Sequence, residues 1–212
     1  MRVGLFGGSF NPIHFGHLRA AEEVREALSL DLVYLIPAAS PPHKVEGDLA
    51  PAEHRLQMVR LATKGNRHFM ASDVEVRRTG RSYTIETIQY YLATLRQPAT
   101  LYLLMGSDQF TELETWKNCD ELVTLCNLAV HTRLAEGQSG PPRVSLAALK
   151  RFGYSRAEDH YVHSSGHTLS FVDTIVFPIS ATAIRQKIQR GQSINYLVPS
   201  DVSDYIRRHG LY

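Results

Sequence analysis

Apolar residues along this chain follow two alternating patterns. Short, continuous apolar runs, such as residues 3–6 and 32–36, are typical of strands buried on both faces of a parallel sheet. Between these runs, residues 15–28 carry apolar side chains at helical spacing, among them Leu18 and Val24. The first part of the chain therefore predicts a strand, a turn, a helix and a second parallel strand.

The same alternation continues along the rest of the chain. Further strands are predicted at residues 69–76, 100–105, 128–131 and 172–178. Further helices are predicted at residues 51–63, 84–95, 119–126, 145–152, 181–190 and 200–208. A Pro-rich stretch at residues 38–50 is typical of a loop. Alternating strands and helices indicate a doubly wound, Rossmann-like parallel sheet in a three-layer α/β/α fold, whose ligands lie at the carboxyl ends of the strands.

The length of 212 residues is sufficient for one domain with a sizeable core, so we expect a single domain over residues 1–212. Residues 132–168 fit the alternation least well and read as an excursion from that domain. Residues 180–212 predict a helical C-terminal part. The sequence contains no internal repeat, heptad run or low-complexity tract.

Composition and charge favour a small-molecule partner. The 23 Lys and Arg residues nearly balance the 21 Asp and Glu residues, and a net charge of +2 does not indicate a nucleic-acid or membrane-surface partner. No apolar stretch approaches the roughly 18 residues of a membrane span, and the first apolar run is too short for a signal peptide. Cys119 and Cys126 lack the spacing of a disulfide framework or a zinc pair. We expect a cytoplasmic protein with reduced thiols and with no membrane or nucleic-acid partner.

The first turn after the first strand carries the chemistry. Residues 6–17 read Phe-Gly-Gly-Ser-Phe-Asn-Pro-Ile-His-Phe-Gly-His. The glycines leave backbone N–H groups open to an anion, and the following helix adds the positive end of its dipole. His14 and His17 project from one helix face, with Gly16 between them, which suggests phosphoryl-type chemistry. From the residues alone, an alternative remains in which one histidine caps the turn and the other is a solvated surface residue. The spacing matches neither the dinucleotide fingerprint nor the P-loop.

This turn resembles the H-x-G-H motif of the nucleotidylyltransferase superfamily, whose members transfer a nucleotidyl group from a nucleoside triphosphate. Residues 179–185, Ile-Ser-Ala-Thr-Ala-Ile-Arg, resemble the distal motif with which that superfamily meets ATP phosphates. Within it, the chain resembles the bacterial nicotinate-nucleotide adenylyltransferases. Four shorter elements carry that closer likeness: residues 41–44, residues 82–84, residues 106–108 with Trp116 downstream, and residues 205–212.

The resemblance implies transfer of the adenylyl group of ATP to nicotinate mononucleotide, with ATP and Mg²⁺ bound together and no metal ligand from the protein. It implies three catalytic residues, His14, His17 and Arg185. The residues that it implies at ATP are Gly7, Gly8, Ser9, Phe10, His17, Gly106, Asp108, Ile179, Ser180, Thr182 and Arg185. Those that it implies at the mononucleotide are Lys44, Thr84 and Trp116, with Lys44 attracting phosphate and the other two holding the ring.

The residue types allow these roles but also plainer ones. The Trp116 indole can stack on a pyridine ring or fill a core or interface position. Lys44 can reach a phosphate or be an ordinary solvated lysine. Asp108 can bond a ribose hydroxyl or cap the next helix. Arg185 near a helix N-terminus opposes the dipole unless an anion or a carboxylate compensates, so a bound triphosphate or a surface Glu would explain it.

Three features depart from the family pattern. Asn11 stands where many relatives carry Asp, and we expect the change to be tolerated. Arg133 lacks the Pro-Gly that often follows it, so no role is carried over to it. His160, His163 and His167 would allow a metal site if their segment were helical. With no Cys nearby and with Gly166 interrupting the cluster, we expect no metal there.

Alternative functions share parts of this pattern. A related adenylyltransferase could act on nicotinamide mononucleotide or phosphopantetheine, although Thr84, Trp116 and the chain length favour nicotinate mononucleotide. A non-catalytic nucleotide-binding module would usually have lost one of the three catalytic residues, and all three are present. A nucleic-acid-binding protein is disfavoured by the near-neutral charge. Assembly as a homo-oligomer is left open.

Overall fold

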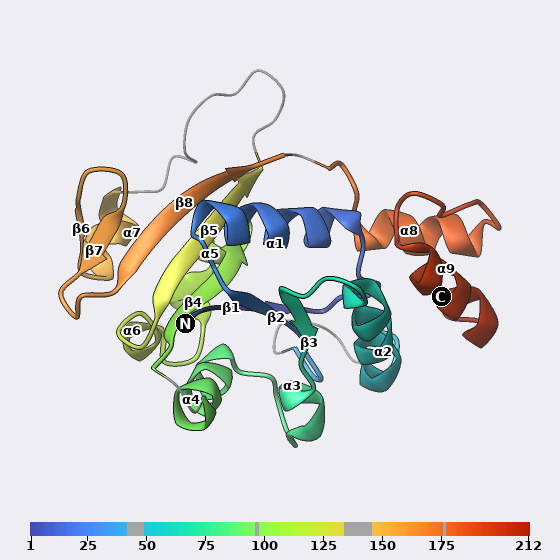
Figure 1. Cartoon of the computed structure of the whole chain (residues 1–212), viewed down its shortest axis with the longest axis horizontal. Coiled ribbons are helices and arrows are strands. Elements are labelled where there is room, and N and C mark those ends of the chain that lie inside the picture. The colour runs from blue at the N-terminus through green and yellow to red at the C-terminus, as the bar shows by residue number, and fades with distance from the viewer. Residues whose placement is uncertain (42–48, 96–97, 134–145, 176) are drawn as a thin grey trace. The chain divides into compact units, whose positions relative to one another are not determined.

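A computed structural model describes residues 1–41, 49–95, 98–133, 146–175 and 177–212 (Figure 1). The chain divides into two compact units. Unit 1 consists of Met1–Phe6, Ala20–Val33 and Tyr83–Val176, and unit 2 consists of Gly7–Arg19, Tyr34–Ser82 and Phe177–Tyr212. The two units interleave along the chain, and a single domain over residues 1–212 stays a prediction.

Unit 1 is built on a mostly parallel sheet. Parallel strands β1 (Arg2–Gly8), β4 (Thr100–Gly106), β5 (Asn127–Arg133) and β8 (Thr168–Thr174) lie side by side in that order. Strands β7 (Tyr161–His163) and β6 (Tyr154–Arg156) extend this sheet in antiparallel fashion. Val3, Leu103 and Leu128 are fully or almost fully buried, as expected for strands covered on both faces.

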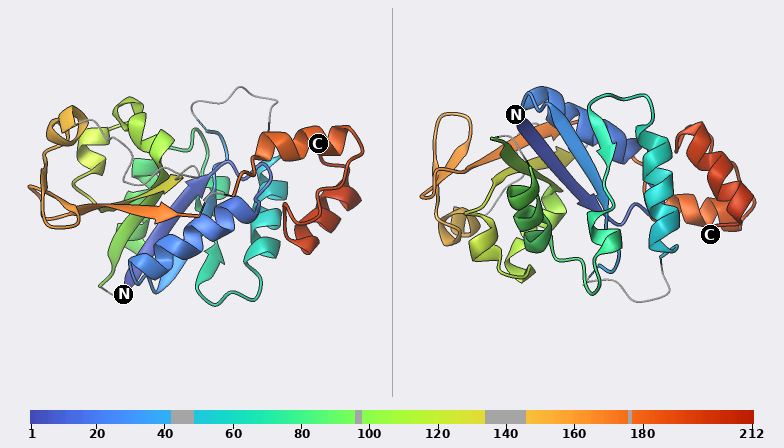
Figure 2. Two further views of the ribbon diagram at one scale, coloured as in Figure 1. Left: turned by 90° about the horizontal axis from the view of Figure 1, so that it is seen from above. Right: turned by 60° about the horizontal axis from the view of Figure 1, so that its bottom comes forward.

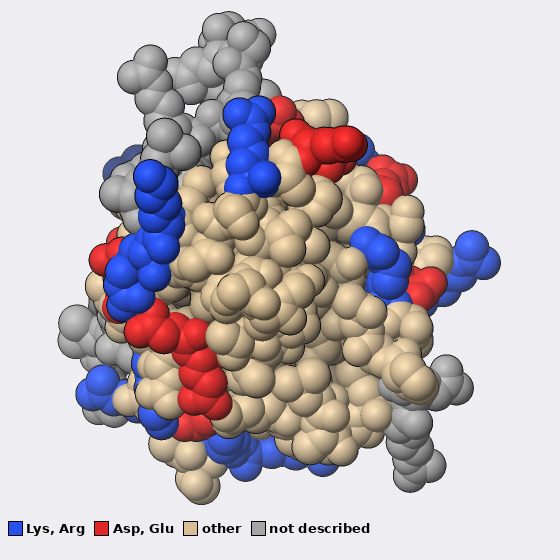
Figure 3. Space-filling model, turned by 90° about the vertical axis from the view of Figure 1, so that its left-hand side faces the viewer, with Lys and Arg blue, Asp and Glu red and all other residues tan. Residues whose placement is uncertain are grey.

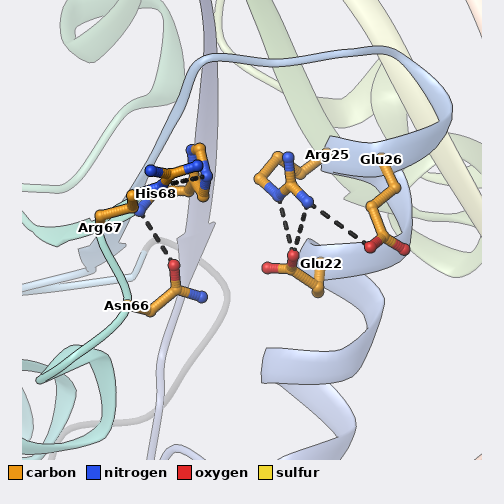
Figure 4. Close-up of polar contacts among 6 residues, drawn as sticks. All are labelled: Glu22, Arg25, Glu26, Asn66, Arg67 and His68. Atoms are coloured by element: carbon orange, nitrogen blue, oxygen red, sulfur yellow. Dashed lines mark hydrogen bonds and ion pairs between the residues drawn. The ribbon is translucent and has the colours of Figure 1, made fainter.

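Helices cover both faces of the unit 1 sheet. Unit 1 contains α1 (Phe15–Ala27, from Ala20), α4 (Thr84–Thr94), α5 (Ser107–Thr111), the 3₁₀ turn η1 (Leu113–Thr115), α6 (Cys119–Leu122) and α7 (Leu146–Arg151). Figure 2 shows α1 on one face of the strands and α4 on the other. On α1, the Arg25 guanidinium lies 2.7 Å from Glu22 and 3.5 Å from Glu26 (Figure 4).

Unit 2 contains strands β2 (Leu32–Pro37, from Tyr34) and β3 (Phe69–Ala71) and helices α2 (Ala52–Thr63), α3 (Val74–Arg77), α8 (Ala181–Gln189) and α9 (Ser200–His209). The turn before β3 is closed by Asn66, whose side-chain oxygen accepts a 2.9 Å hydrogen bond from the backbone N–H of His68 (Figure 4). Helices α2 and α9 pack together, and the His54 ring contacts the Tyr205 hydroxyl at 2.8 Å.

Within unit 1 the strands follow the hydrogen-bonded order β1-β4-β5-β8-β7-β6. Helices on both faces of a mainly parallel sheet confirm the predicted Rossmann-like, three-layer α/β/α class. The antiparallel strands β6 and β7 depart from an all-parallel sheet. Figure 3 shows the end of the molecule near these two strands, where a broad area without charged side chains is bordered by Lys, Arg, Asp and Glu.

Three predicted elements have different bounds in the structure. The strand expected at residues 69–76 ends at Ala71, because a turn at Ser72 and Asp73 starts α3. The strand expected at residues 172–178 is β8, which starts at Thr168 and ends at Thr174. The helix expected at residues 119–126 is only the short α6, followed by turns. Val74 and Val76, which were expected in a strand, lie in α3 instead, and the chain after Leu122 continues in turns.

Residues 132–168 hold more regular structure than predicted. Helix α7 and strands β6 and β7 lie in this segment, with residues 134–145 outside the described part. Arg151 on α7 makes two hydrogen bonds to the carboxylate of Asp120. His163 lies in a strand, so the helical condition for a metal site at the three histidines is not met. Gly166 has φ +89° in the turn between β7 and β8, a conformation that favours glycine.

Both cysteines are buried and carry free thiols. Burial raises the pKa of Cys126 to about 12, so it is no reactive thiolate at neutral pH. Within the described residues, no helix combines the length and apolar character needed to cross a membrane.

Candidate active site

The turn between β1 and α1 has an unusual backbone path. Phe10 has φ 44°, and the peptide bond between Asn11 and Pro12 is cis. A Cβ at Gly8 would lie 3.0 Å from the Phe10 ring, a tight contact that glycine avoids. Helix α1 follows at once, and the N–H of His17 donates to the carbonyl of His14. The turn thus leads directly into a helix N-terminus, a site that favours anions.

The two histidines of this turn lie against each other. The rings of His14 and His17 stack with centroids 3.7 Å apart, and the Phe10 ring meets His17 edge-on at 5.1 Å. His14 is 2% exposed and His17 is half-buried. A Cβ at Gly16 would lie 3.0 Å from the His14 ring, so the absent side chain permits this approach. The predicted pair of imidazoles on one face is therefore present.

The distal motif meets this turn. Ser180 caps α8, since its hydroxyl accepts a 3.1 Å hydrogen bond from the N–H of Ala183. One nitrogen of Arg185 donates to the carbonyl of Asn11 at 2.9 Å, and another donates to the Thr182 hydroxyl at 3.3 Å. Residues 174 positions apart thus form one contact. Arg185 is bonded to the turn, not to a surface Glu, and the described residues take up two of its five N–H donors.

Arg55 is a residue that sequence reasoning missed. Its side chain is 1% exposed and donates to four backbone carbonyls within 3.1 Å. These acceptors are Ser9, Ala38, Ala39 and Ala50. Burial lowers the pKa of Arg55, but a guanidinium keeps its charge at neutral pH. Nothing in the helical pattern of residues 51–63 distinguishes Arg55 from an exposed arginine.

Asn11 connects the turn to two further segments. Its side-chain oxygen accepts hydrogen bonds from the N–H of Ala50 at 3.0 Å and from the Tyr212 hydroxyl at 2.8 Å. Asn11 is 2% exposed, so both bonds are sheltered from water. The amide therefore has a structural place in the turn.

A second group of predicted residues lies in unit 1, at the carboxyl ends of β4 and β5. Gly106 caps α5 and its N–H donates to the side chain of Gln109 at 3.0 Å. A Cβ at Gly106 would collide with the carboxylate of Asp108 and come within 3.5 Å of the His131 ring. Asp108 is exposed, whereas His131 is 7% exposed and meets Phe6 edge-on. Sequence reasoning missed His131. This residue pairs with Gly106 where the parallel strands β4 and β5 lie side by side.

Thr84 and Trp116 are also in unit 1. The residues next to them in the sequence contact each other and connect the start of α4 with the chain after η1. Thr84 begins α4, and Trp116 follows η1. The ammonium of Lys117 lies 4.3 Å from the centroid of the Tyr83 ring and 2.7 Å from the Glu86 carboxylate. The Trp116 side chain is half-buried and is not part of the core. This is compatible with an aromatic platform beside the start of α4.

The loop predicted to carry Lys44 is only partly described. The Ser82 hydroxyl accepts hydrogen bonds from the N–H groups of Ala39 and Ser40, which anchors the chain just before residues 42–48. Lys44 itself lies outside the described residues.

A cavity of about 620 Å³ lies elsewhere in unit 2, around residues 188–195 and 203–212. Its lining contains none of the predicted site residues, although Tyr212 belongs to it. Within the described ranges, no three His, Cys, Asp or Glu side chains gather as a metal site would need.

Comparison with known proteins identifies the family. A family model described as cytidylyltransferase-like matches residues 5–187. A Geobacter metallireducens relative named "Probable nicotinate-nucleotide adenylyltransferase" is 43% identical over 100% of this chain and 98% of its own length. A Citrifermentans bemidjiense relative of the same name is 42% identical, again over 100% and 98%. The chain belongs to the nicotinate-nucleotide adenylyltransferase family.

Solved structures agree with this fold. A Plasmodium falciparum nicotinic acid mononucleotide adenylyltransferase complexed with NaAD matches 100% of this chain and 97% of its own, with a TM-score of 0.72 at 17% identity. The same enzyme complexed with APC gives a TM-score of 0.71 at 16% identity, over 100% and 96% of the two chains. At such identities the likeness shows the fold, and it confirms the predicted fold class.

Proposed function

We propose that this protein transfers the adenylyl group of ATP to nicotinate mononucleotide, giving nicotinate adenine dinucleotide and pyrophosphate, a step of NAD biosynthesis. The observation that carries the proposal is the contact between the two motifs, in which Arg185 bonds to the carbonyl of Asn11 beside the stacked His14 and His17. Relatives about 40% identical over their full length are named for this activity.

The proposed reaction is a direct displacement at the α-phosphorus of ATP. An oxygen of the mononucleotide phosphate forms the new bond, and the bond from the α-phosphorus to the pyrophosphate oxygen breaks. A phosphate monoester with a second pKa of about 6 is mostly a dianion at neutral pH, so it needs no general base. The protein then has to position the reactants and stabilise charge.

The residues around the first turn would supply that stabilisation. We assign the backbone from Gly7 to Phe10 and the N-terminus of α1 to the triphosphate, because N–H groups at such turns favour anions. His14, His17 and Arg185 would offset the charge on the α-phosphate and the departing pyrophosphate. At the start of α8, Ile179, Ser180 and Thr182 would meet the phosphates from the other motif.

The remaining assignments concern unit 1 and the loop. Asp108, following Gly106, would bond a sugar hydroxyl of the nucleotide. Trp116 would stack on the pyridine ring, which an indole face does well, beside Thr84 at the start of α4. Lys44 would attract phosphate.

Magnesium would enter with ATP. The side-chain oxygen of Asn11 already accepts two hydrogen bonds, and the first turn contains no carboxylate. These residues fit a hard cation held by phosphate oxygens and water, as Mg²⁺ commonly is, better than one held by protein ligands. When bound, Mg²⁺ would neutralise charge that develops on the phosphates.

The same proposal includes small-molecule substrates, a cytoplasmic location and no nucleic-acid or membrane partner. The balanced charge of the sequence supports the absence of a nucleic-acid partner and of a membrane partner. Homo-oligomer formation stays open.

The function is tested by pyrophosphate release from ATP and Mg²⁺ with three acceptors in parallel: nicotinate mononucleotide, nicotinamide mononucleotide and phosphopantetheine. We expect strong preference for the nicotinate acceptor. Release with another acceptor alone would keep nucleotidyl transfer but overturn the proposed substrate. No release with any of them would favour a non-catalytic nucleotide-binding module.

A further inference from the structure

The hydroxyl of Tyr212 lies behind the turn that carries the two histidines. It donates a 2.8 Å hydrogen bond to the side-chain oxygen of Asn11, and the N–H of Ala50 donates to the same oxygen at 3.0 Å. An amide oxygen has two lone pairs, so these two donors satisfy it. Because Asn11 is 2% exposed, water cannot readily replace a donor that is lost.

Asn11 is held at its other end by Arg185. The guanidinium donates to the carbonyl of Asn11 at 2.9 Å, so Tyr212 and Arg185 bond to different groups of one residue. Three residues later along the chain is His14, which is 2% exposed and stacks on His17. Asn11 therefore connects Tyr212 with Arg185 and lies in the same turn as the histidine pair.

Further hydrogen bonds connect the groups around Asn11. Ala50, which donates to Asn11, also accepts a 2.8 Å hydrogen bond from buried Arg55. Arg55 in turn bonds to the carbonyl of Ser9 at 2.8 Å. The positive charges of Arg55 and Arg185 act on Tyr212 and lower its pKa, although burial raises that pKa more strongly. The tyrosine remains a neutral hydrogen-bond donor near neutral pH.

We infer that Tyr212 is a positioning residue for adenylyl transfer, which fixes Asn11 so that its carbonyl holds Arg185 in place to meet the triphosphate. The inference rests on the proposed function for the chemistry, but the predicted effect on ATP binding does not depend on the acceptor. Tyr212 would act through Asn11 and would not touch the substrates. Its loss should therefore affect ATP more than the mononucleotide.

The test compares Tyr212→Phe with the unchanged protein. Without this hydrogen bond Arg185 should be held less well for the triphosphate, and we expect ATP binding to weaken about 5-fold, which corresponds to about 1 kcal/mol. We expect the Kd for ATP with Mg²⁺, measured by calorimetry, and the KM for ATP to rise by that factor. We expect the KM for nicotinate mononucleotide to change less than about 2-fold, within the spread of an indirect effect. Tyr196→Phe is the matched control, because Tyr196 is 91% exposed and should change none of these values.

A second pair of variants tests the route through Asn11. In an Asn11→Ala background, Tyr212→Phe should have no further effect on ATP affinity, because its acceptor is gone. Equal, additive losses in the two backgrounds would overturn the inference. It would also be overturned if Tyr212→Phe left ATP affinity unchanged, or weakened both substrates in parallel with a loss of Tm. If the variant is less stable, affinity is measured at a lower temperature at which circular dichroism shows it folded.

Failure of the proposed function gives a different result. In that case the unchanged protein forms no dinucleotide from nicotinate mononucleotide, whereas the calorimetric comparison of ATP binding still decides the role of Tyr212.

Discussion

At the scale of single residues, the candidate site combines groups that sequence motifs reveal with groups that they do not. His14, His17 and Arg185 belong to recognisable spacings, and the structure stacks the two histidines and bonds Arg185 to the carbonyl of Asn11 in the same turn. Arg55 and Tyr212 support the same turn from positions with no motif. Their roles depend on contacts between residues far apart in the sequence, and the periodicity of apolar residues does not predict such contacts.

Replacing His17 tests the proposed charge stabilisation. His17→Ala should lower kcat by about 100-fold or more, the usual effect of losing a group that stabilises transition-state charge. The half-buried ring packs on His14 and Phe10, so circular dichroism and Tm should confirm that the variant is folded. A normal turnover rate in a folded His17→Ala protein would contradict the assignment.

Trp116→Ala tests the ring platform. We expect the KM for nicotinate mononucleotide to rise by at least 10-fold, corresponding to about 1.4 kcal/mol of lost stacking and burial, while the KM for ATP changes little. Trp116→Phe should recover part of the loss, since a smaller aromatic face remains. Equal losses for both substrates would show that Trp116 has another role.

At the scale of elements, the N-terminus of α8 carries both a helix cap and residues that we propose to meet the triphosphate. The Ser180 hydroxyl caps the first turn, and Thr182 and Arg185 follow on the same helix. Substitutions at Ser180 should therefore be able to change the stability of the helix end and its affinity for an anion independently of each other.

Two substitutions at Ser180 make that separation. Ser180→Ala removes the cap and should cost about 1 kcal/mol of unfolding free energy, measured in urea. Ser180→Asp keeps a capping oxygen and should retain stability, but its negative charge should weaken ATP binding beside the triphosphate. Tighter ATP binding by Ser180→Asp would exclude α8 from the phosphate site.

Elements with clear apolar patterns were predictable, whereas those defined by pairing were not. Helix α1 and strands β1, β2 and β4 agree with the sequence prediction to within about two residues, a usual uncertainty of element ends. Strands β6 and β7 were missed, since each has three residues and depends on partners in the sheet. Apolar Ile175 extended the predicted strand, yet it is 63% exposed beyond β8.

At the scale of the whole molecule, buried titratable groups should limit stability at high pH. Burial raises the pKa of Cys126 to about 12 and also raises that of Tyr154, which is 4% exposed. In the unfolded chain these groups ionise near their ordinary values of 9 and 10. A raised pKa in the folded state therefore contributes stability that is present below pH 9 and declines as the pH rises through 9 to 12.

The pH dependence is measured as the urea midpoint between pH 7 and pH 11. We expect the midpoint to fall above pH 9, and Tyr154→Phe should make the fall less steep above pH 10. A midpoint independent of pH over this range would show that neither buried group is linked to unfolding.

The most direct test of the central claim is whether the purified protein forms nicotinate adenine dinucleotide from ATP, Mg²⁺ and nicotinate mononucleotide, with the product measured by chromatography and pyrophosphate measured alongside. The account predicts equimolar dinucleotide and pyrophosphate, with strong preference over nicotinamide mononucleotide and loss of both products in His17→Ala. Absence of dinucleotide from the folded, ATP-binding protein would contradict it.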